Sequence, residues 1–254
     1  HRLTTVTALQ RATREGHLRL AYQPIVDRQD RLIGAEALLR WDHDGELLSP
    51  ARFLELAEDT GLILPMGAWV LGQACSDLES IKCSIPALRW ISVNMSSRQL
   101  LDERLPLLIH RAMQTHEIPA RSIAIEIAEE TLREDDGRAA SVLSELTDIA
   151  VMLSLADLAT DQAVLQRIDT LPIDTIKLDR GFVQQLDVDV DGHFRSLAMA
   201  VLELASEAGI SVIAEGVETE SQAKILRDLG CPHFQGFRYG APLDLASFIT
   251  RASA

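Results

Sequence analysis

The stretch SVIAEGVETESQAKILRDLGCPHFQG, residues 211–236, contains the pattern that decides the fold. It reads as an apolar strand that ends at Glu215, an amphipathic helix near 219–229, and a second strand that ends at Gln235. A strand, a helix and a strand in this order predict two parallel strands joined by a right-handed crossover. Both strands end on a polar residue that an apolar core would not need, which predicts a functional site at the carboxyl edge of the sheet.

The same alternation extends towards the N-terminus and predicts a closed barrel. Strands are expected at 18–26, 32–41, 90–95, 122–127, 151–157, 174–178, 211–215 and 233–236. Helices are expected after Ser49-Pro50 and near 66–82, 97–115, 137–148, 161–168, 180–186, 194–208, 219–229 and 244–252. The first two strands are separated by a short polar turn, which is typical of an antiparallel hairpin. Eight strands alternating with helices predict an α/β fold, a TIM-like (β/α)8 barrel with one antiparallel strand from the opening hairpin.

Length, charge and hydropathy restrict the class of protein. A chain of 254 residues, 47% of them hydrophobic, suits a single domain over 1–254. A net charge of −14 argues against binding to a nucleic-acid polymer or to an anionic membrane. The sequence has no long apolar run and no signal peptide, so we expect a cytoplasmic domain without direct membrane insertion. Because the chain opens at His1, we expect it to be a fragment of a longer multidomain protein.

A series of polar residues stands at or near the ends of successive expected strands. They are Glu36, Asn94, Glu126, Asp157, Lys177, Glu215 and Gln235. Carboxylate and amide oxygens are the ligands that Mg²⁺ and Mn²⁺ prefer. A lysine beside metal-bound carboxylates is a common means of holding a phosphate. A single acid at a strand end would be explained as a cap of the following helix, but a series of them favours a site at the barrel mouth.

Seven short motifs occur in order over most of the chain. They are Tyr22-Gln23-Pro24-Ile25-Val26, Glu36-Ala37-Leu38-Leu39-Arg40, Asn94-Met95-Ser96, Glu126-Ile127-Ala128-Glu129, Lys177-Leu178-Asp179, Ala214-Glu215-Gly216-Val217-Glu218, and Gln235-Gly236 followed by Pro242. Together they resemble the signature of the EAL-domain family, which comprises cyclic di-GMP phosphodiesterases and their catalytically inactive receptor relatives. The resemblance implies a cyclic di-GMP site at the mouth of the barrel.

The resemblance also implies roles for single residues. In the family, two divalent metals activate the water that opens one phosphodiester of cyclic di-GMP. The implied metal ligands are Glu36, Asn94, Glu126, Asp157 and Glu215. The implied catalytic residues are Lys177, which would orient water and phosphate, with Glu36 and Glu215, all three as remnants of a catalytic set. The implied ligand-binding residues are Gln23, Glu36, Leu38, Arg40, Asn94, Asp157, Lys177, Asp179, Glu215 and Gln235.

The chain departs from the family pattern at one strand end. Where the family reads DDFGTG, this sequence reads ADLATD, residues 156–161. The resemblance assigns to position 156 the carboxylate shared by both metals, and the methyl group of Ala156 cannot bridge two cations. Ala159 and Asp161 replace both glycines, so we expect the loop to adopt another shape. Ala128 likewise replaces a threonine hydroxyl close to Glu126.

Three functions are therefore open. The first is a degenerate EAL domain that binds cyclic di-GMP and signals to a protein partner or to an adjacent GGDEF or sensory domain. The second is a slow phosphodiesterase, dependent on Mg²⁺ or Mn²⁺, in which Asp157 or Asp161 replaces the missing ligand and linear pGpG is released. The third is a protein-interaction domain without nucleotide binding. For the first we expect Mg²⁺ or Mn²⁺ to bind weakly or not at all, and we expect no organic cofactor.

Without metals, the carboxylates of the mouth would repel the two phosphates of the ligand. Three solutions remain open from the sequence. One cation still binds, some carboxyl groups take up protons, or the ligand lies towards Arg40 and Lys177.

Overall fold

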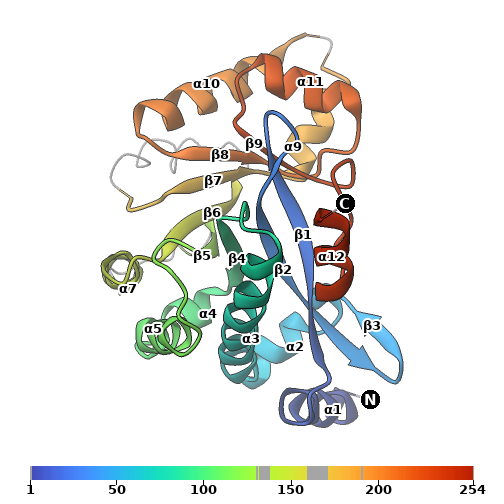
Figure 1. The fold of residues 1–254 in the computed structure, drawn as a ribbon, viewed down its shortest axis with the longest axis vertical. Helices are drawn as coiled ribbons and strands as arrows, with labels where there is room; N and C mark the ends of the chain where they lie inside the picture. Colours follow the sequence, from blue (N-terminus) through green and yellow to red (C-terminus); the bar gives the residue numbers. More distant parts are fainter. Residues whose placement is uncertain (1, 130, 132–137, 159–170, 190, 254) are drawn as a thin grey trace.

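The computed structural model describes residues 2–129, 131, 138–158, 171–189 and 191–253, and these form a barrel of strands surrounded by helices (Figure 1). The strands are β1 (Leu18–Asp27), β2 (Leu32–His43), β3 (Glu46–Leu48), β4 (Trp90–Met95), β5 (Ile123–Ala128), β6 (Met152–Leu158), β7 (Thr175–Leu178), β8 (Ser211–Ala214) and β9 (His233–Gln235). Their order is β1-β9-β8-β7-β6-β5-β4-β2-β3, and a β1–β2 pairing closes the ring.

The direction of the strands confirms the predicted architecture. β1 runs antiparallel to both of its neighbours, β2 and β9, while the other neighbouring pairs in the ring are parallel. Eight strands thus form a closed mixed barrel with one antiparallel strand from the opening hairpin. β3, which the sequence pattern did not predict, pairs with the outer end of β2 and lies beyond the ring.

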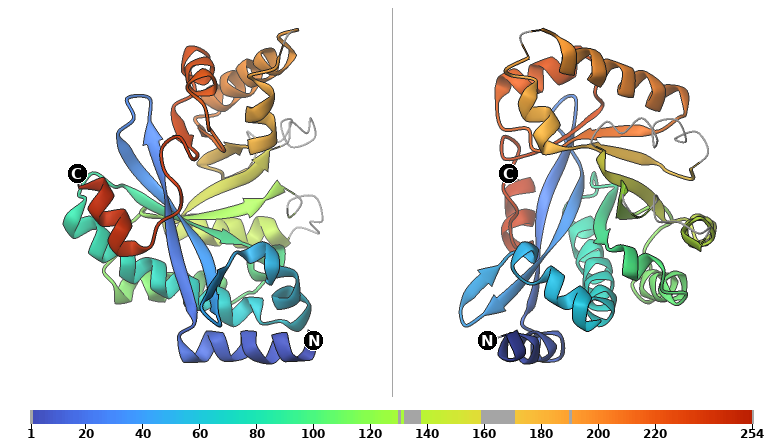
Figure 2. Two further views of the ribbon diagram at one scale, coloured as in Figure 1. Left: turned by 90° about the vertical axis from the view of Figure 1, so that its right-hand side faces the viewer. Right: turned by 180° about the vertical axis from the view of Figure 1, so that it is seen from behind.

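Helices cover the outside of the barrel (Figure 2). They are α1 (Arg2–Glu15), α2 (Leu54–Thr60), α3 (Ile63–Ser84), α4 (Ser97–Leu100), α5 (Leu105–Thr115), α7 (Arg138–Asp148), α9 (Arg180–Gln185), α10 (His193–Glu207), α11 (Glu220–Asp228) and α12 (Leu245–Ala252). The last of them, α12, packs on β1 through Phe248, whose ring centre lies 5.9 Å from that of Tyr22. None of the helices in the described part of the chain is long and apolar enough to cross a membrane.

Two helical segments differ from the sequence-based expectation. Although no helix was expected before residue 18, α1 buries Leu9 and Ala12 against a second core cluster. The single helix expected over 97–115 is divided into α4 and α5. Pro106 stands in the first turn of α5 and has no backbone N–H, so a helix could not continue through it without interruption. Between the two helices the Asp102 carboxylate accepts a hydrogen bond of 3.0 Å from the Arg104 backbone. The helix expected near 161–168 lies outside the described residues.

An apolar cluster fills the lower part of the barrel interior. It contains Ile25, Ile33, Trp90, Ala124 and Ile213, and we call it the barrel plug. The indole of Trp90 lies against Gly34, where a Cβ atom would come within 2.7 Å of the ring, so this position admits only glycine without a shift of the tryptophan. The plug closes one end of the barrel and leaves the opposite mouth for polar residues.

Strand register places polar residues together above the plug. On β4, Trp90 and Asn94 belong to the same alternating set, and therefore point to the same face of the strand. Asn94 lies beside Glu126 on β5, and Gln23 on β1 lies beside Glu36 on β2. The inward face of β4 thus begins with Trp90 of the plug and ends with Asn94 at the mouth, whereas in the antiparallel β1 Gln23 at the mouth precedes Ile25 of the plug.

The loops that follow β8 and β9 approach each other closely at the mouth. Gly236 has φ +156°, and a Cβ atom there would lie 2.1 Å from the carbonyl oxygen of Val217. The Val217 backbone donates a hydrogen bond of 3.0 Å to the carbonyl of Gln235. This glycine therefore allows the two loops to bring Glu215 and Gln235 to the same rim.

Candidate functional site

Lys177 lies at the centre of the barrel mouth and is fully buried. Its Nζ atom donates hydrogen bonds to Glu36 Oε2 at 3.0 Å and to Glu126 Oε2 at 2.7 Å, and it also forms an ion pair with Glu215. We call Glu36, Glu126 and Glu215 the carboxylate triad. Burial of an ammonium group is costly, and these three carboxylates offset that cost. The lysine predicted to clamp phosphate is therefore already engaged by the protein.

Mutual charge sets the protonation of this cluster. Burial alone would lower the pKa of Lys177, but the triad outweighs burial and holds that pKa well above its ordinary value. Burial would raise the pKa of Glu36, yet Lys177 and the amides of Gln235 and Asn94 lower it overall. Burial and the charge of Glu36 raise the pKa of Glu126 to about 7. One of the three carboxyl groups is therefore partly protonated near neutral pH.

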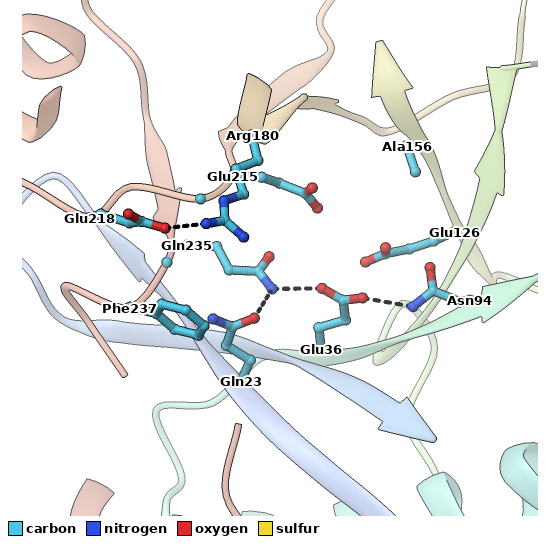
Figure 3. Close-up of a pocket in the computed structure, with 12 residues that line it drawn as sticks. Gln23, Glu36, Asn94, Glu126, Ala156, Arg180, Glu215, Glu218, Gln235 and Phe237 are labelled. Carbon is cyan, nitrogen blue, oxygen red and sulfur yellow. Dashed lines mark hydrogen bonds and ion pairs between the residues drawn. The ribbon is translucent and has the colours of Figure 1, made fainter. Parts of the chain in front are cut away.

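Glu36 is fixed by amide side chains from two other strands, β4 and β9 (Figure 3). Asn94 Nδ2 donates to Glu36 Oε1 at 2.6 Å, and Gln235 Nε2 donates to Glu36 Oε2 at 2.6 Å. Gln235 Nε2 also lies 3.1 Å from Gln23 Oε1, and Gln23 donates in turn to the carbonyl of Gly240 at 3.2 Å. These bonds hold Glu36 in one orientation and confirm that the strand ends meet at one mouth.

The donor atoms of the triad fit a single divalent cation. One carboxylate oxygen from each member lies within 4.8 Å of the others. Glu126 Oε1 is buried and has no hydrogen-bond partner, although buried polar atoms in proteins are nearly always paired. Oxygen donors of this kind suit Mg²⁺ or Mn²⁺. Ala156 also lines the cavity but presents only a methyl group towards it.

Two cavities meet at this centre. The first, the polar cavity, has a volume of about 270 Å³ and is lined by Gln23, Glu36, Asn94, Glu126, Ala156, Arg180, Glu215, Gly216, Glu218, Gln235, Gly236 and Phe237. The second, the apolar cavity, has a volume of about 600 Å³ and extends between β2, α2 and α3. Its walls include Leu38, Leu54, Ile63, Met66 and Val70. Both cavities share Glu36, Asn94, Glu126 and Ala156, so they flank the acidic centre on two sides.

Three residues at the rim of the polar cavity were missed from the sequence. Arg180 forms an ion pair of 2.7 Å with Glu218. Phe237, which lies on the same side of the cavity, is 60% exposed (Figure 3). All three lie in loops or at a helix start next to quoted motifs, because Arg180 follows Asp179, Glu218 ends the AEGVE motif and Phe237 follows Gly236. Only their position next to the motifs could have indicated these three residues from the sequence, because loop residues show no helix or strand periodicity.

The remaining predicted site residues do not line the polar cavity in the described part of the chain. Leu38 lines the apolar cavity. Arg40 is half-buried, donates to the carbonyl of Leu39, and lines neither cavity. The carboxylate of Asp179 accepts a hydrogen bond from the Phe182 backbone and caps α9. Asp157 belongs to β6, but its side chain lies outside the described part of the chain, as do Ala159 and Asp161.

Replacement of Glu126 by Gln tests the electrostatics of the triad. A carboxyl group whose pKa is raised on folding, here from 4.5 to about 7, binds its proton more tightly in the folded state. The wild type therefore loses stability as the pH rises through this interval. The Glu126→Gln variant lacks this group and does not share this loss. We therefore expect the free energy of unfolding of the variant, relative to that of the wild type, to increase as the pH rises from 4.5 to 7.

Urea unfolding in EDTA at pH 5 and at pH 8 measures this difference. The amide keeps the shape of the side chain, so a change of packing has little part in the comparison. If the wild type and the variant show the same dependence on pH, Glu126 does not titrate in this range.

Comparison with known proteins adds sequence relatives. A family model described as EAL domain matches residues 6–242. An uncharacterized protein of Mycobacterium tuberculosis, Rv1357c, is 35% identical over 248 residues, which are 95% of this chain and 80% of that protein. The bifunctional diguanylate cyclase/cyclic di-GMP phosphodiesterase MucR of Pseudomonas aeruginosa is 35% identical over 237 residues, which are 92% of this chain but 34% of MucR.

Solved structures show the same barrel. The EAL enzyme Bd1971, in a form with cAMP and cyclic di-GMP bound, matches with a TM-score of 0.90 and 27% identity over 99% of this chain and 69% of that chain. The MucR phosphodiesterase in complex with cyclic di-GMP matches with a TM-score of 0.88 and 33% identity over 96% of this chain and 99% of that chain. The family match over most of the sequence, together with the shared barrel, shows that this chain belongs to the EAL domain family.

Proposed function

We propose that this chain is a cyclic di-GMP receptor module in which hydrolysis is impaired. One observation carries the proposal. The mouth of the barrel keeps a fixed carboxylate and amide centre, whereas Ala156 lines both cavities and contributes no oxygen. The site therefore keeps the means to recognise a ligand and lacks an element of the chemistry. Bd1971 and MucR, whose structures were determined with cyclic di-GMP, support the choice of ligand.

The two cavities support an extended ligand with two bases. The apolar cavity offers aliphatic walls to one planar base, and the exposed ring of Phe237 offers a stacking surface to the other. The shared centre, with Glu36 and Asn94, lies between them. A cyclic dinucleotide has this arrangement, because its two bases flank a ring that carries both phosphates.

Hydrolysis would require more cations than the residues present can hold. Glu36, Glu126 and Glu215 would hold one Mg²⁺ or Mn²⁺, which when bound supplies a Lewis acid and lowers the pKa of a bound water. Two cations about 3.5–4 Å apart need an anion between them. The resemblance to the family places that anion at position 156, where the chain has a methyl group. We therefore expect weak binding of one metal and slow or absent cleavage.

Protein groups compensate for the missing charge. The ammonium group of Lys177 neutralises part of the negative charge of the triad. Because the pKa of Glu126 is raised, this carboxyl group retains a proton to a higher pH than an ordinary glutamate. Asn94 and Gln235 donate to Glu36 and hold it away from other orientations. Of the solutions open from the sequence, uptake of a proton by a carboxyl group thus finds support in the raised pKa of Glu126. A ligand position towards Arg40 has no such support, because Arg40 lines neither cavity.

A slow phosphodiesterase is the second candidate, and a specific finding favours it. MucR, which is 35% identical to this chain, is named as a cyclic di-GMP phosphodiesterase. In this case Asp157 or Asp161 would replace the missing ligand. We further propose that the module reports to a protein partner or to a neighbouring domain, since the matching part of MucR is 34% of that protein.

Titration with cyclic di-GMP in the presence of EDTA tests the receptor function. We expect calorimetry to show binding in the micromolar range or tighter without metal, because Lys177 already offsets the triad. The same affinity within a few-fold is expected with Mg²⁺. Phe237→Ala should lose about tenfold in affinity, since stacking on a base contributes roughly 1–3 kcal/mol.

Chromatography of the same samples separates the three functions. Intact ligand after prolonged incubation with Mn²⁺ supports the receptor, whereas accumulation of linear pGpG supports the enzyme. Absence of heat at tens of micromolar protein, with and without EDTA, would favour an interaction domain and end the receptor proposal.

The variant Ala156→Asp tests the role of the missing carboxylate. We expect it to bind Mn²⁺ more tightly than the wild type by at least about 10–100-fold, because a direct metal ligand is restored and even the loss of an outer-shell partner has an effect of this size. We expect little gain in hydrolysis, because Ala159 and Asp161 still stand where the family pattern has glycines. Ala156→Val serves as the control, since it adds volume without an oxygen donor. A large gain in pGpG production would show that position 156 was the sole defect.

A further inference from the structure

The polar cavity is strongly acidic for a site that receives phosphates. Four of its lining residues are carboxylates, namely Glu36, Glu126, Glu215 and Glu218. The two phosphodiester groups of a cyclic dinucleotide are anions at neutral pH. Like charges in a partly desolvated cavity repel strongly, so binding needs a cation that the ligand can reach.

Lys177 cannot fill this need by direct contact. Its side chain is fully buried and does not line the cavity. Its ammonium group contacts all three members of the carboxylate triad, which use its hydrogen-bonding capacity. A lysine has three donors and no acceptor, so a phosphate contact would require it to leave a carboxylate that is itself buried.

Arg180 is the one cationic side chain among the described residues that line the polar cavity. Its Nη2 atom lies 2.7 Å from Glu218 Oε1, and its side chain is 56% exposed. Figure 3 shows the arginine and Glu218 at one side of the cavity, across from Ala156 and Glu126. An exposed ion pair of this kind contributes little to stability, so exchange of Glu218 for another anion costs little.

The backbone positions this arginine. Gly216 has φ +63°, and a Cβ atom there would lie 2.2 Å from Arg180 Cγ. The aliphatic part of the Arg180 side chain therefore lies directly on Gly216. Gly216 follows Glu215 in the sequence and precedes Glu218 by two residues. Both the close approach and the left-handed torsion require glycine. The guanidinium is thus directed towards the cavity by the local backbone.

We propose that Arg180 binds a phosphodiester of the ligand and determines specificity for phosphate-bearing ligands, by exchanging Glu218 for a phosphate oxygen. This inference rests on the proposed function of cyclic di-GMP binding. A guanidinium can donate two parallel hydrogen bonds to a phosphate, and such charge-assisted bonds are among the strongest in proteins. Arg180 then supplies at the rim a positive charge that a second metal would otherwise bring to the centre.

Calorimetry with cyclic di-GMP in EDTA tests this role. We expect Arg180→Ala to weaken binding by about tenfold to hundredfold, the range for a hydrogen bond to a charged group. Arg180→Lys should restore part of the loss, since it keeps the charge but not the bidentate geometry. The loss in Arg180→Ala should shrink when the salt concentration is raised from about 50 to about 300 mM, because salt screens exposed charges.

Two further variants separate local contact from net charge. Arg195→Ala removes an exposed arginine on α10 that does not line the cavity, and we expect its affinity to equal that of the wild type. Glu218→Gln frees Arg180 from its partner and also removes one repelling charge, so we expect affinity to rise more in the wild-type background than in the Arg180→Ala background, where only the loss of repulsion remains.

The outcomes distinguish this inference from the receptor proposal. If the wild type binds and Arg180→Ala binds within twofold of it, Arg180 is not a phosphate ligand and the receptor proposal stands. If Glu218→Gln weakens binding in both backgrounds, Glu218 contacts the ligand itself and the exchange is wrong. If the wild type does not bind, the receptor proposal fails.

Discussion

The contact between the Lys177 ammonium group and the carboxylate triad is the interaction on which the site depends. It joins β7 to β2, to β5 and to the loop after β8, and therefore crosses the barrel mouth in three directions. Without the lysine, three carboxylates would share a buried space at considerable electrostatic cost. Without the carboxylates, a buried ammonium group would be unpaired. Each group thus explains the presence of the other, and neither is free to serve the ligand alone.

The residues that stabilise the barrel are buried, and the residues proposed to contact the ligand lie at the rim. Below the mouth, the barrel plug around Trp90 fills the interior. At the mouth, amides from Asn94 and Gln235 fix Glu36. The residues with exposed surface lie further out, where Phe237 and Arg180 stand at the rim. We propose that loss of the carboxylate at position 156 affects the chemistry at the centre and leaves recognition at the rim intact.

Much of the fold was predictable because strand and helix periodicity is local. The barrel strands were expected within a few residues, and Glu36, Asn94, Glu126, Glu215 and Gln235 were expected at one mouth because each stands at or near a strand end. What the sequence could not show depends on contacts between distant segments. The burial of Lys177 could not be predicted, because the sequence around a lysine at a strand end is the same whether the side chain contacts a ligand or three carboxylates. The capping of α9 by the Asp179 carboxylate was likewise hidden, because the sequence alone did not show which backbone group this side chain contacts.

Crystals grown with Mn²⁺ and cyclic di-GMP, measured at the manganese absorption edge, test the central claim most directly. The account predicts an intact cyclic dinucleotide across both cavities and no second Mn²⁺ beside Ala156. Two manganese ions about 3.5–4 Å apart, bridged by an oxygen of another side chain and accompanied by linear product, would contradict it.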